Sequence, residues 1–212
     1  MKRTITVFIV VALLATIAVA QWRNAKAFAY LEENGELGDW EFCGQPLAQD
    51  STVPHWLPGM WPRKLKISAI PDDTDRYCAA ARRIPRLDEI EVFVEESLSQ
   101  DIFDALGSIP DVRVLDLMSP SVNDSGFQSF AQFESVRKLY LASSTITDGS
   151  IDHILKFRSV FTIGLNNNPI SDSNILKLAE LPALRELILF EELLPETIAT
   201  LRLKRSDIII SL

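Results

Sequence analysis

Apolar residues recur at fixed positions in three consecutive 24-residue segments of the chain, which align with one another without a gap. The middle segment has its apolar positions at Val136, Leu139, Leu141, Ile146, Ile151, Ile154 and Phe157, and both neighbouring segments are apolar in the same columns. Each segment opens with L-x-L alternation, which is typical of a short strand with one buried side. Its later apolar residues recur at every third position, which indicates a short helical segment with one buried stripe.

Looser copies of the same unit flank the three central ones. Two copies precede them, beginning at Leu65 and Leu87, and one follows, beginning at Leu184. The chain then ends in the strand-like stretch 207–212. We therefore expect a repeat domain over residues 62–212, with six units and a terminal strand. Since no single unit can bury its own apolar side chains, the units must stack and cover one another.

A period of about 20–29 residues with an L-x-x-L-x-L strand is the signature of leucine-rich repeats. The loop before each helical segment reads [IV]-[TSN]-D, at Val122–Asp124, Ile146–Asp148 and Ile170–Asp172, and in this the chain resembles bacterial leucine-rich-repeat proteins. Asn168 occupies the position of that family's loop asparagine. The resemblance implies an α/β solenoid, with parallel strands on a concave face and short helices on a convex face. It also implies a non-catalytic interaction scaffold without a cofactor, of a kind that is often exported or membrane-anchored.

The N-terminal segment 1–22 carries no charge from Thr4 to Trp22. This run matches the ~17–25 apolar residues that cross a bilayer, which favours an N-terminal hydrophobic helix as a membrane anchor through residues 4–22. A cleaved signal peptide is the alternative, because Ala18–Ala20 forms an A-x-A cleavage site. Under both interpretations, the repeat domain is exported across the membrane. It would stay anchored on the periplasmic or extracellular side in the first case and be secreted in the second.

Residues 23–61 do not repeat, and they separate the apolar segment from the repeat domain. Their first part has the composition of a juxtamembrane helix, and the remainder is turn-rich and contains Trp40, Trp56 and Trp61. The open end of a repeat array requires a cap that keeps its core dry. We therefore expect residues 23–61 to form a juxtamembrane helix and an N-terminal cap, with the tryptophans packed against the unit that begins at Leu65.

Charge and cysteine usage exclude two classes of function. The net charge of −8 and the pI of about 4.8 argue against nucleic acid as a partner, because its phosphates require a surplus of lysine and arginine. Cys43 and Cys78 show no C-x-x-C spacing and predict no metal site. The two cysteines either form one disulfide between the cap and the first unit after export, or remain thiols.

Aspartates occupy one column of the repeat, where the helical segment begins. They are Asp75, Asp124, Asp148 and Asp172. An aspartate there, or the serine or threonine before it, can accept unpaired backbone N–H groups and complement the helix dipole, so we interpret the column as helix caps. A calcium site is disfavoured, because the acidic stretch 71–75 is not followed by the central glycine and distal glutamate of an EF-hand loop. A hydrolase that uses these carboxylates is the lowest-ranked alternative.

Side chains suited to nucleophilic catalysis are few. The two histidines are His55, which falls in the expected cap, and His153, which falls on a solvent-facing helix position. Neither lies in a motif that joins a nucleophile to its base. The sequence therefore favours binding over catalysis.

Strand residues that alternate with the buried leucines point outwards and form the concave face. They include aromatic, methionine and aliphatic side chains, which are the usual anchors of protein interfaces. The predicted protein-binding residues are Phe93, Met118, Tyr140, Asn166, Ile188 and Phe190. We expect a protein partner, whose identity the sequence does not specify, to bind this face.

The terminal strand 207–212 is apolar and is followed by no polar capping unit. An uncovered apolar edge strand pairs readily with other chains. Self-association through this strand, as in a structural or surface protein, is therefore the alternative function.

Overall fold

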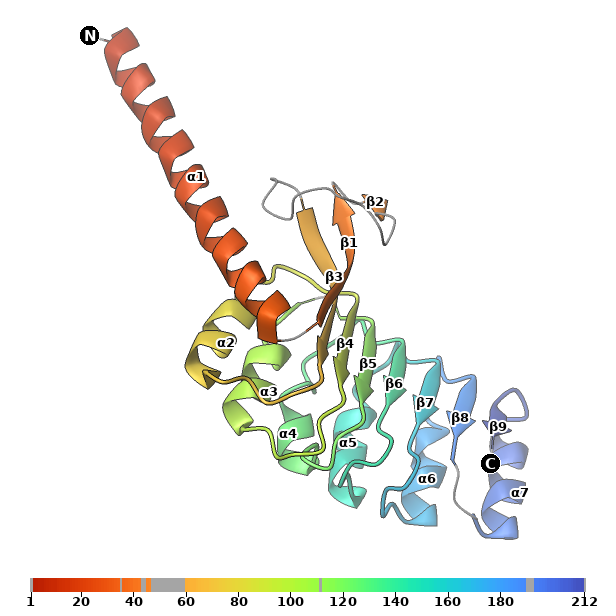
Figure 1. Cartoon of the computed structure of the whole chain (residues 1–212). Helices are drawn as coiled ribbons and strands as arrows, with labels where there is room; N and C mark the ends of the chain where they lie inside the picture. The colour runs from red at the N-terminus through yellow and green to blue at the C-terminus, as the bar shows by residue number, and fades with distance from the viewer. Residues whose placement is uncertain are drawn as a thin grey trace.

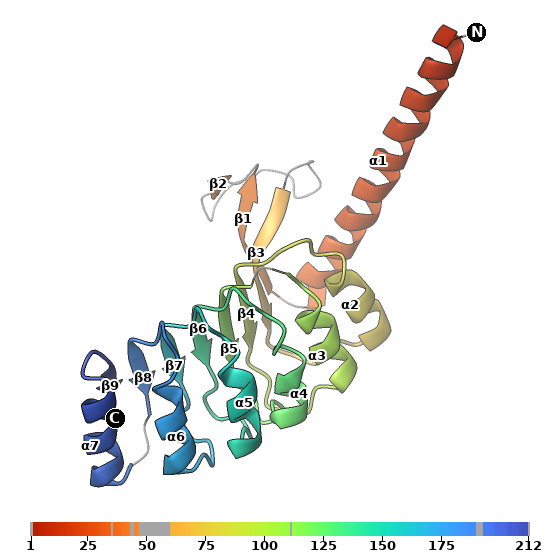
Figure 2. The ribbon, with the colours of Figure 1, turned by 180° about the vertical axis from the view of Figure 1, so that it is seen from behind.

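The computed structural model is a two-layer α/β arrangement from which one long helix projects (Figure 1). A single sheet forms one layer, and the short helices of the repeat units cover one face of it (Figures 1 and 2). The structure describes residues 2–34, 36–42, 45–46, 60–110, 112–189 and 193–211.

The sheet contains one strand from each repeat unit. Its strands are β1 (Glu36–Phe42), β2 (Gln45–Pro46), β3 (Met60–Ile67), β4 (Glu89–Val92), β5 (Val114–Leu117), β6 (Lys138–Tyr140), β7 (Thr162–Gly164), β8 (Glu186–Ile188) and β9 (Ile209–Ser211). They follow the spatial order β2-β1-β3-β4-β5-β6-β7-β8-β9. The seven strands from β3 to β9 are parallel, as predicted, and β1 and β2 add antiparallel pairing at one edge. Leu115, Leu139 and Ile163 are paired laterally, so residues that the sequence aligns 24 positions apart are neighbours in space.

A helical segment returns the chain from one strand to the next. These segments and the N-terminal helix are α1 (Lys2–Asn34), α2 (Thr74–Ala81), α3 (Gln100–Gly107), α4 (Asp124–Gln128), the 3₁₀ turn η1 (Asp148–Ser150), α5 (Ile151–Ile154), α6 (Asp172–Leu178) and α7 (Pro195–Lys204). Most are shorter than the ~12 residues that an isolated helix needs. Their stability therefore comes from packing against the sheet.

The core lies between the sheet and the helices. The seven apolar residues of the middle unit, predicted to point inwards, are each at most 1 % exposed. Rings from successive units meet edge to face, with Phe127 and Phe157 6.0 Å apart between centroids and Phe103 and Phe130 6.2 Å apart. Such pairs add about 0.5–1.5 kcal/mol to the contact between units beyond the burial of area.

The C-terminal end of α1 covers the first unit on the helix side. Phe28, Tyr30 and Leu31 are buried there. The Tyr30 hydroxyl donates to the carbonyl oxygen of Asp73 at 3.0 Å, and the Arg76 guanidinium lies 4.0 Å from the centre of the Tyr30 ring. The contact joins α1 to the start of α2 and closes that end of the core.

On the sheet side, β1 pairs antiparallel with β3 and so covers the first repeat strand. The described cap therefore consists of one helix end and one strand. The predicted packing of the tryptophans at 40, 56 and 61 falls on side chains that lie outside the described part of the chain.

Helix α1 runs without interruption from the segment predicted as an anchor into the cap. Among the residues that the structure describes, no helix combines the length and the apolar character needed to cross a membrane. The anchor over residues 1–22 therefore stays a prediction.

Arg205 closes the opposite end of the repeat domain. Its guanidinium donates to the carbonyl oxygens of Ala179, Leu181 and Leu184 at 3.2, 3.0 and 2.9 Å, and it pairs with Asp207 at 2.8 Å. These bonds tie the loop after α6 to the segment that leads into β9.

A buried asparagine joins the loops of two units. Asn168 is 2 % exposed, and its Oδ1 accepts from the Ile146 N–H at 3.2 Å and the Ser144 hydroxyl at 2.7 Å. Its amide nitrogen donates to the carbonyl oxygens of Leu141 and Asn166. Both acceptor positions and both donor positions of the amide are therefore used.

We predict that Asn168→Ala lowers the free energy of unfolding by about 2–4 kcal/mol, because it leaves two or more buried polar groups unpaired at about 1–3 kcal/mol each. Urea unfolding of the variant measures this loss. The control is Asn174→Ala, which removes one exposed hydrogen bond to Ser171 and should cost at most about 0.5 kcal/mol. Equal losses in the two variants would contradict the role of Asn168.

Candidate functional site

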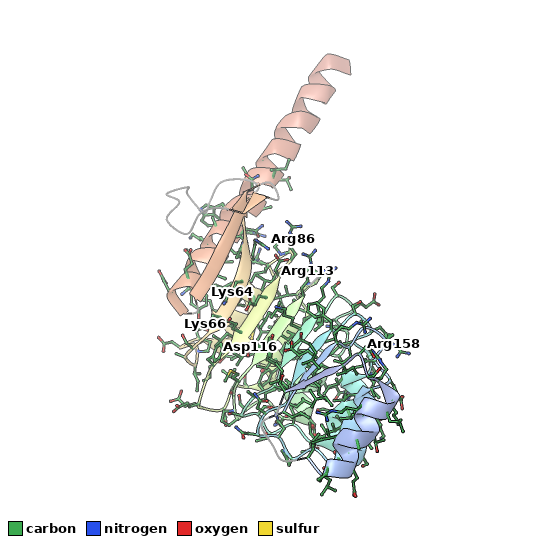
Figure 3. All side chains as sticks on the ribbon, turned by 90° about the vertical axis from the view of Figure 1, so that its right-hand side faces the viewer. Lys64, Lys66, Arg86, Arg113, Asp116 and Arg158 are labelled. Atoms are coloured by element: carbon green, nitrogen blue, oxygen red, sulfur yellow. The ribbon has the colours of Figure 1, made fainter. Side chains whose placement is uncertain are left out.

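The strand face is the surface formed by side chains of β3 to β8 that point away from the helix layer. These residues alternate with core residues such as Leu65 and Ile90, which are 0 % exposed. Its first row is Lys64, Glu89, Val114, Lys138, Thr162 and Glu186, and its second row is Lys66, Glu91, Asp116, Tyr140, Gly164 and Ile188. Figure 3 shows Lys64, Lys66 and Asp116 along the neighbouring strands.

One half of the strand face is charged. The Lys64 ammonium lies 2.5 Å from the Glu91 carboxylate and 3.6 Å from that of Glu89. Burial lowers the pKa of Lys64, but the hydrogen bonds and charges of Glu91 and Glu89 together outweigh this, so the net change is upwards. Burial and the neighbouring Glu91 raise the pKa of Glu89, against the opposing effect of Lys64. The single ammonium group of Lys64 is therefore paired with two carboxylates.

Asp116 lies beside this group, and its Oδ1 is buried and has no hydrogen-bond partner among the described residues. Burial, reinforced by the nearby Glu91, raises the pKa of Asp116 to about 6, although Lys64 acts in the opposite direction. At neutral pH, Asp116 is therefore an ionised acceptor with one unused oxygen.

In the other half of the strand face, the second row (Tyr140, Gly164 and Ile188) is mainly apolar. The ring of half-buried Tyr140 lies across Gly164, where an added Cβ would stand 3.0 Å from Tyr140 Cδ1 and 3.9 Å from the Ile188 Cβ. The absence of a side chain at position 164 therefore leaves room for the Tyr140 ring on the strand face. Burial raises the pKa of Tyr140, followed by the charges of Glu186 and Asp116, so the phenol stays protonated at neutral pH.

A third row lies two positions further along each strand. Met118 is 38 % exposed, and half-buried Phe93 has the Lys66 ammonium 5.8 Å from its ring centre. Asn166 has a buried Oδ1 without a partner among the described residues. Phe190 lies outside the described residues.

The structure thus places five of the six predicted binding residues on one face. The prediction missed Lys64, Glu89, Glu91 and Asp116, which face the same way. The alignment of the repeats places these charged residues in the outward columns, and that was the signal that could have identified them.

The four aspartates of the column do not cap their own helices, whereas Thr147, the threonine before Asp148, caps η1 as predicted. The side-chain caps are Asp73 for α2, Asn123 for α4 and Thr147 for η1, each one residue before the helical segment begins. Asp75 lies within the first turn of α2. A capping residue must have extended backbone. Asp124 already lies inside its helix, so the cap is the preceding residue, Asn123.

The remaining aspartates instead bind the next unit along the stack. Asp124 accepts from the Thr147 backbone N–H at 2.9 Å and from the hydroxyls of Thr147 and Ser150 at 2.5 Å. Asp148 accepts from the Ser171 backbone N–H at 2.8 Å.

Asp172 repeats this pattern and accepts from the Leu194 backbone N–H at 3.1 Å. Burial raises the pKa of Asp124, but the hydrogen bonds from Ser150 and Thr147 outweigh it and lower the pKa overall. The column is a chain of links between units, which leaves little support for the hydrolase alternative.

The other candidate groups are dispersed. Cys78 is a free, buried thiol whose Sγ donates to the Asp101 carbonyl oxygen at 3.3 Å, and burial raises its pKa. Cys43 and His55 lie outside the described residues. His153 Nδ1 lies 3.3 Å from the Lys156 ammonium on the helix side. Within the described residues, no three His, Cys, Asp or Glu side chains are grouped to hold a metal ion.

We predict that Asp124→Ala lowers the free energy of unfolding by about 1–3 kcal/mol, because the Thr147 N–H and the buried Ser150 hydroxyl lose their acceptor. Asp75→Ala is the matched control from the same column and should cost less than about 1 kcal/mol. Denaturant unfolding of both variants compares them. A larger loss in Asp75→Ala than in Asp124→Ala would indicate that these aspartates cap helices rather than link units.

Asp116 predicts a distinctive dependence of stability on pH. Its folded pKa of about 6 exceeds the ~3.9 of an unfolded aspartate, so its contribution to stability is complete below about pH 4 and is lost as pH rises through about 6. The difference in stability between Asp116→Asn and the wild type should therefore favour the variant more at pH 7 than at pH 4. The full shift corresponds to about 3 kcal/mol, which solvent screening of this partly exposed group reduces to about 1 kcal/mol.

Chemical unfolding at a series of pH values between 4 and 7.5 measures this difference. Met118→Leu, on the same face, is the control and should parallel the wild-type profile. Parallel profiles for Asp116→Asn and the wild type would rule out a raised pKa at Asp116.

None of the available protein-family models matches this chain. A search of curated proteins likewise finds no match. Among solved structures, an internalin from Listeria monocytogenes matches it with a TM-score of 0.45 and 11% sequence identity. The match covers 71% of this chain and 47% of that chain, so this chain spans about half the length of the internalin.

Proposed function

We propose that the chain is a protein-binding scaffold whose strand face holds a partner protein, and that residues 1–22 display it on the outer side of a membrane. The observation that supports binding most directly is the unpaired, buried oxygen of Asp116 in the middle of the strand face. A buried polar atom without a partner costs about 1–3 kcal/mol. A hydrogen-bond donor from a bound protein would remove that cost.

The two halves of the strand face define the chemistry of the partner. A lysine or arginine side chain of the partner fits beside Asp116 and Glu91, where one lysine already serves two carboxylates. An apolar side chain fits on Tyr140 and Met118, since aromatic and methionine side chains often anchor interfaces. The partner surface should therefore combine a cation with an adjacent apolar group.

The face is suited to binding because it is rigid before the partner arrives. Its strands are fixed by parallel pairing on both sides, and Tyr140 is held against Gly164. Preorganised side chains lose little conformational freedom on binding. The short helices lie on the opposite face of the sheet, which leaves this one accessible (Figures 1 and 2).

Self-association is the second candidate function, and the edge strand β9 favours it. Ile209 on this strand is 64 % exposed, and Leu203 and Leu194 nearby in the sequence are 88 % and 54 % exposed. As the last strand of the described sheet, β9 can pair with a strand from a second copy. The two candidates use different surfaces and can be separated.

We predict that a photoreactive amino acid at position 118 crosslinks the partner in cells that produce the full chain, whereas one at position 156 on the helix side does not. Asp116→Ala combined with Tyr140→Ser should abolish the crosslink at position 118, because both halves of the face are changed. Mass spectrometry of the crosslinked product identifies the partner.

Ile209→Lys is the control that addresses self-association. It should leave the crosslink at position 118 unchanged while the melting temperature of each variant stays close to that of the wild type. A crosslink that survives Asp116→Ala/Tyr140→Ser would refute the strand-face site. A product that is a second copy of the chain and is lost in Ile209→Lys would support the second candidate instead.

A further inference from the structure

A cavity of about 270 Å³ lies at the junction of α1 and α2, where the long helix meets the first repeat unit. Its polar lining consists of Arg23, Lys26, Arg76 and Arg83, and the rings of Trp22 and Tyr30 complete its walls. The remaining lining residues are alanines, whose small side chains leave the space open. No acidic residue is among those that line the cavity.

Four cations converge on the cavity from two elements. Arg23 and Lys26 are three residues apart on α1 and so share a face of that helix. Arg76 lies on α2 and Arg83 in the turn that follows it. Like charges gathered in one place repel one another unless a counter-charge is present. This concentration of positive charge is unusual in a chain whose net charge is −8.

Burial, and after it the charges of Asp73 and Asp72, raise the pKa of Tyr30, so these two carboxylates supply part of the counter-charge near the cavity. None of the ion pairs formed within the described part of the chain involves these four side chains. Asp73, the carboxylate at the start of α2, uses its Oδ1 to accept the Arg76 backbone N–H at 2.9 Å. An external anion bound between the four cations would reduce their mutual repulsion.

Two of the cations are held in place by aromatic rings. The Lys26 ammonium lies 4.1 Å from the centre of the Trp22 ring, and the Arg76 guanidinium lies 4.0 Å from that of Tyr30. A guanidinium stacked on a ring keeps its N–H groups available at its edge. Arginine forks match the oxygens of a phosphate group, and charge-assisted hydrogen bonds of this kind are the strong ones.

We propose that this cavity binds a phosphate group, supplied either by the headgroup of an anionic phospholipid or by a soluble phosphate ester. The position of the cavity along α1 connects it to the lipid source. With a rise of about 1.5 Å per residue, Arg23 and Lys26 lie within about 6 Å of Trp22 along the helix axis. Tryptophan and basic residues next to an apolar helix occupy the headgroup level of a bilayer. The lipid source, unlike the phosphate site itself, rests on the proposed membrane location.

The test is a calorimetric titration of the full chain in a nonionic detergent with three probes: dihexanoyl phosphatidylglycerol, glycerol 3-phosphate and glycerol. We expect saturable binding of at least one phosphate-bearing probe and none of glycerol. Arg23→Gln/Arg83→Gln should weaken the binding at least tenfold, because it removes two cations that make no ring contact. Arg76→Gln is a second, independent variant and should weaken it in the same direction.

The matched control is Arg137→Gln/Arg158→Gln, which removes the same charge elsewhere and should bind like the wild type. Binding of the lipid alone assigns the headgroup as the source, and binding of glycerol 3-phosphate assigns a soluble phosphate ester. Absence of binding by both phosphate probes, or equal weakening in the control variant, would overturn the proposal. Crosslinking at position 118 should persist in Arg23→Gln/Arg83→Gln, so failure of the cavity and failure of the strand face are distinguishable.

Discussion

The lateral contact between repeat units is the constraint on which the rest of the structure depends. Each unit from β4 to β8 contributes a strand of three or four residues and a helical segment of a few turns at most, and neither element is stable alone. Stacking pairs Leu115 with Leu139 and Leu139 with Ile163, so each apolar side chain is covered by its counterparts on both sides. The register survives small differences in spacing, because Leu65 pairs with Ile90 25 residues on and Leu115 with Leu139 24 residues on, so the loops absorb the extra residue.

Stacking also explains the polar residues of the loops. When one unit covers the next, it separates loop backbone groups from water, and these groups must then find partners within the protein. Asp124 and Asp148 accept hydrogen bonds from the following loop. The side-chain amide of Asn168 accepts hydrogen bonds from Ser144 and Ile146 in the loop of the preceding unit. Residues that suggest a catalytic or metal site by composition are therefore parts of the repeat itself. Their hydrogen bonds hold the units at the spacing that the apolar columns require.

The same arrangement separates the core from the strand face. The helices cover one face of the sheet and complete the core, so the side chains on the strand face are free to combine charge with apolar surface. Asp116 and Tyr140 illustrate this, since one carries an unpaired buried oxygen and the other a half-buried ring. The end of the stack imposes a different requirement, because the first unit has no preceding unit to cover it. Helix α1 meets this requirement with buried Phe28 and Leu31, and it also carries Arg23 and Lys26, two of the four cations of the cavity beside α2.

The sequence by itself determined the period, the alternation of strand and helical segment, and the buried columns, because these follow from the local spacing of apolar residues. It also placed Phe93, Met118, Tyr140 and Ile188 on the outward side of their strands. Only the tertiary structure decided that α1 and β1 form the described cap, that Asp124 binds the next unit rather than its own helix, and that Asp116 is buried beside Glu91. These features depend on distances between residues about one repeat or more apart and on the water that neighbouring units exclude. Local spacing carries no record of either, so the links between units and the burial of Asp116 emerged only when the units were stacked.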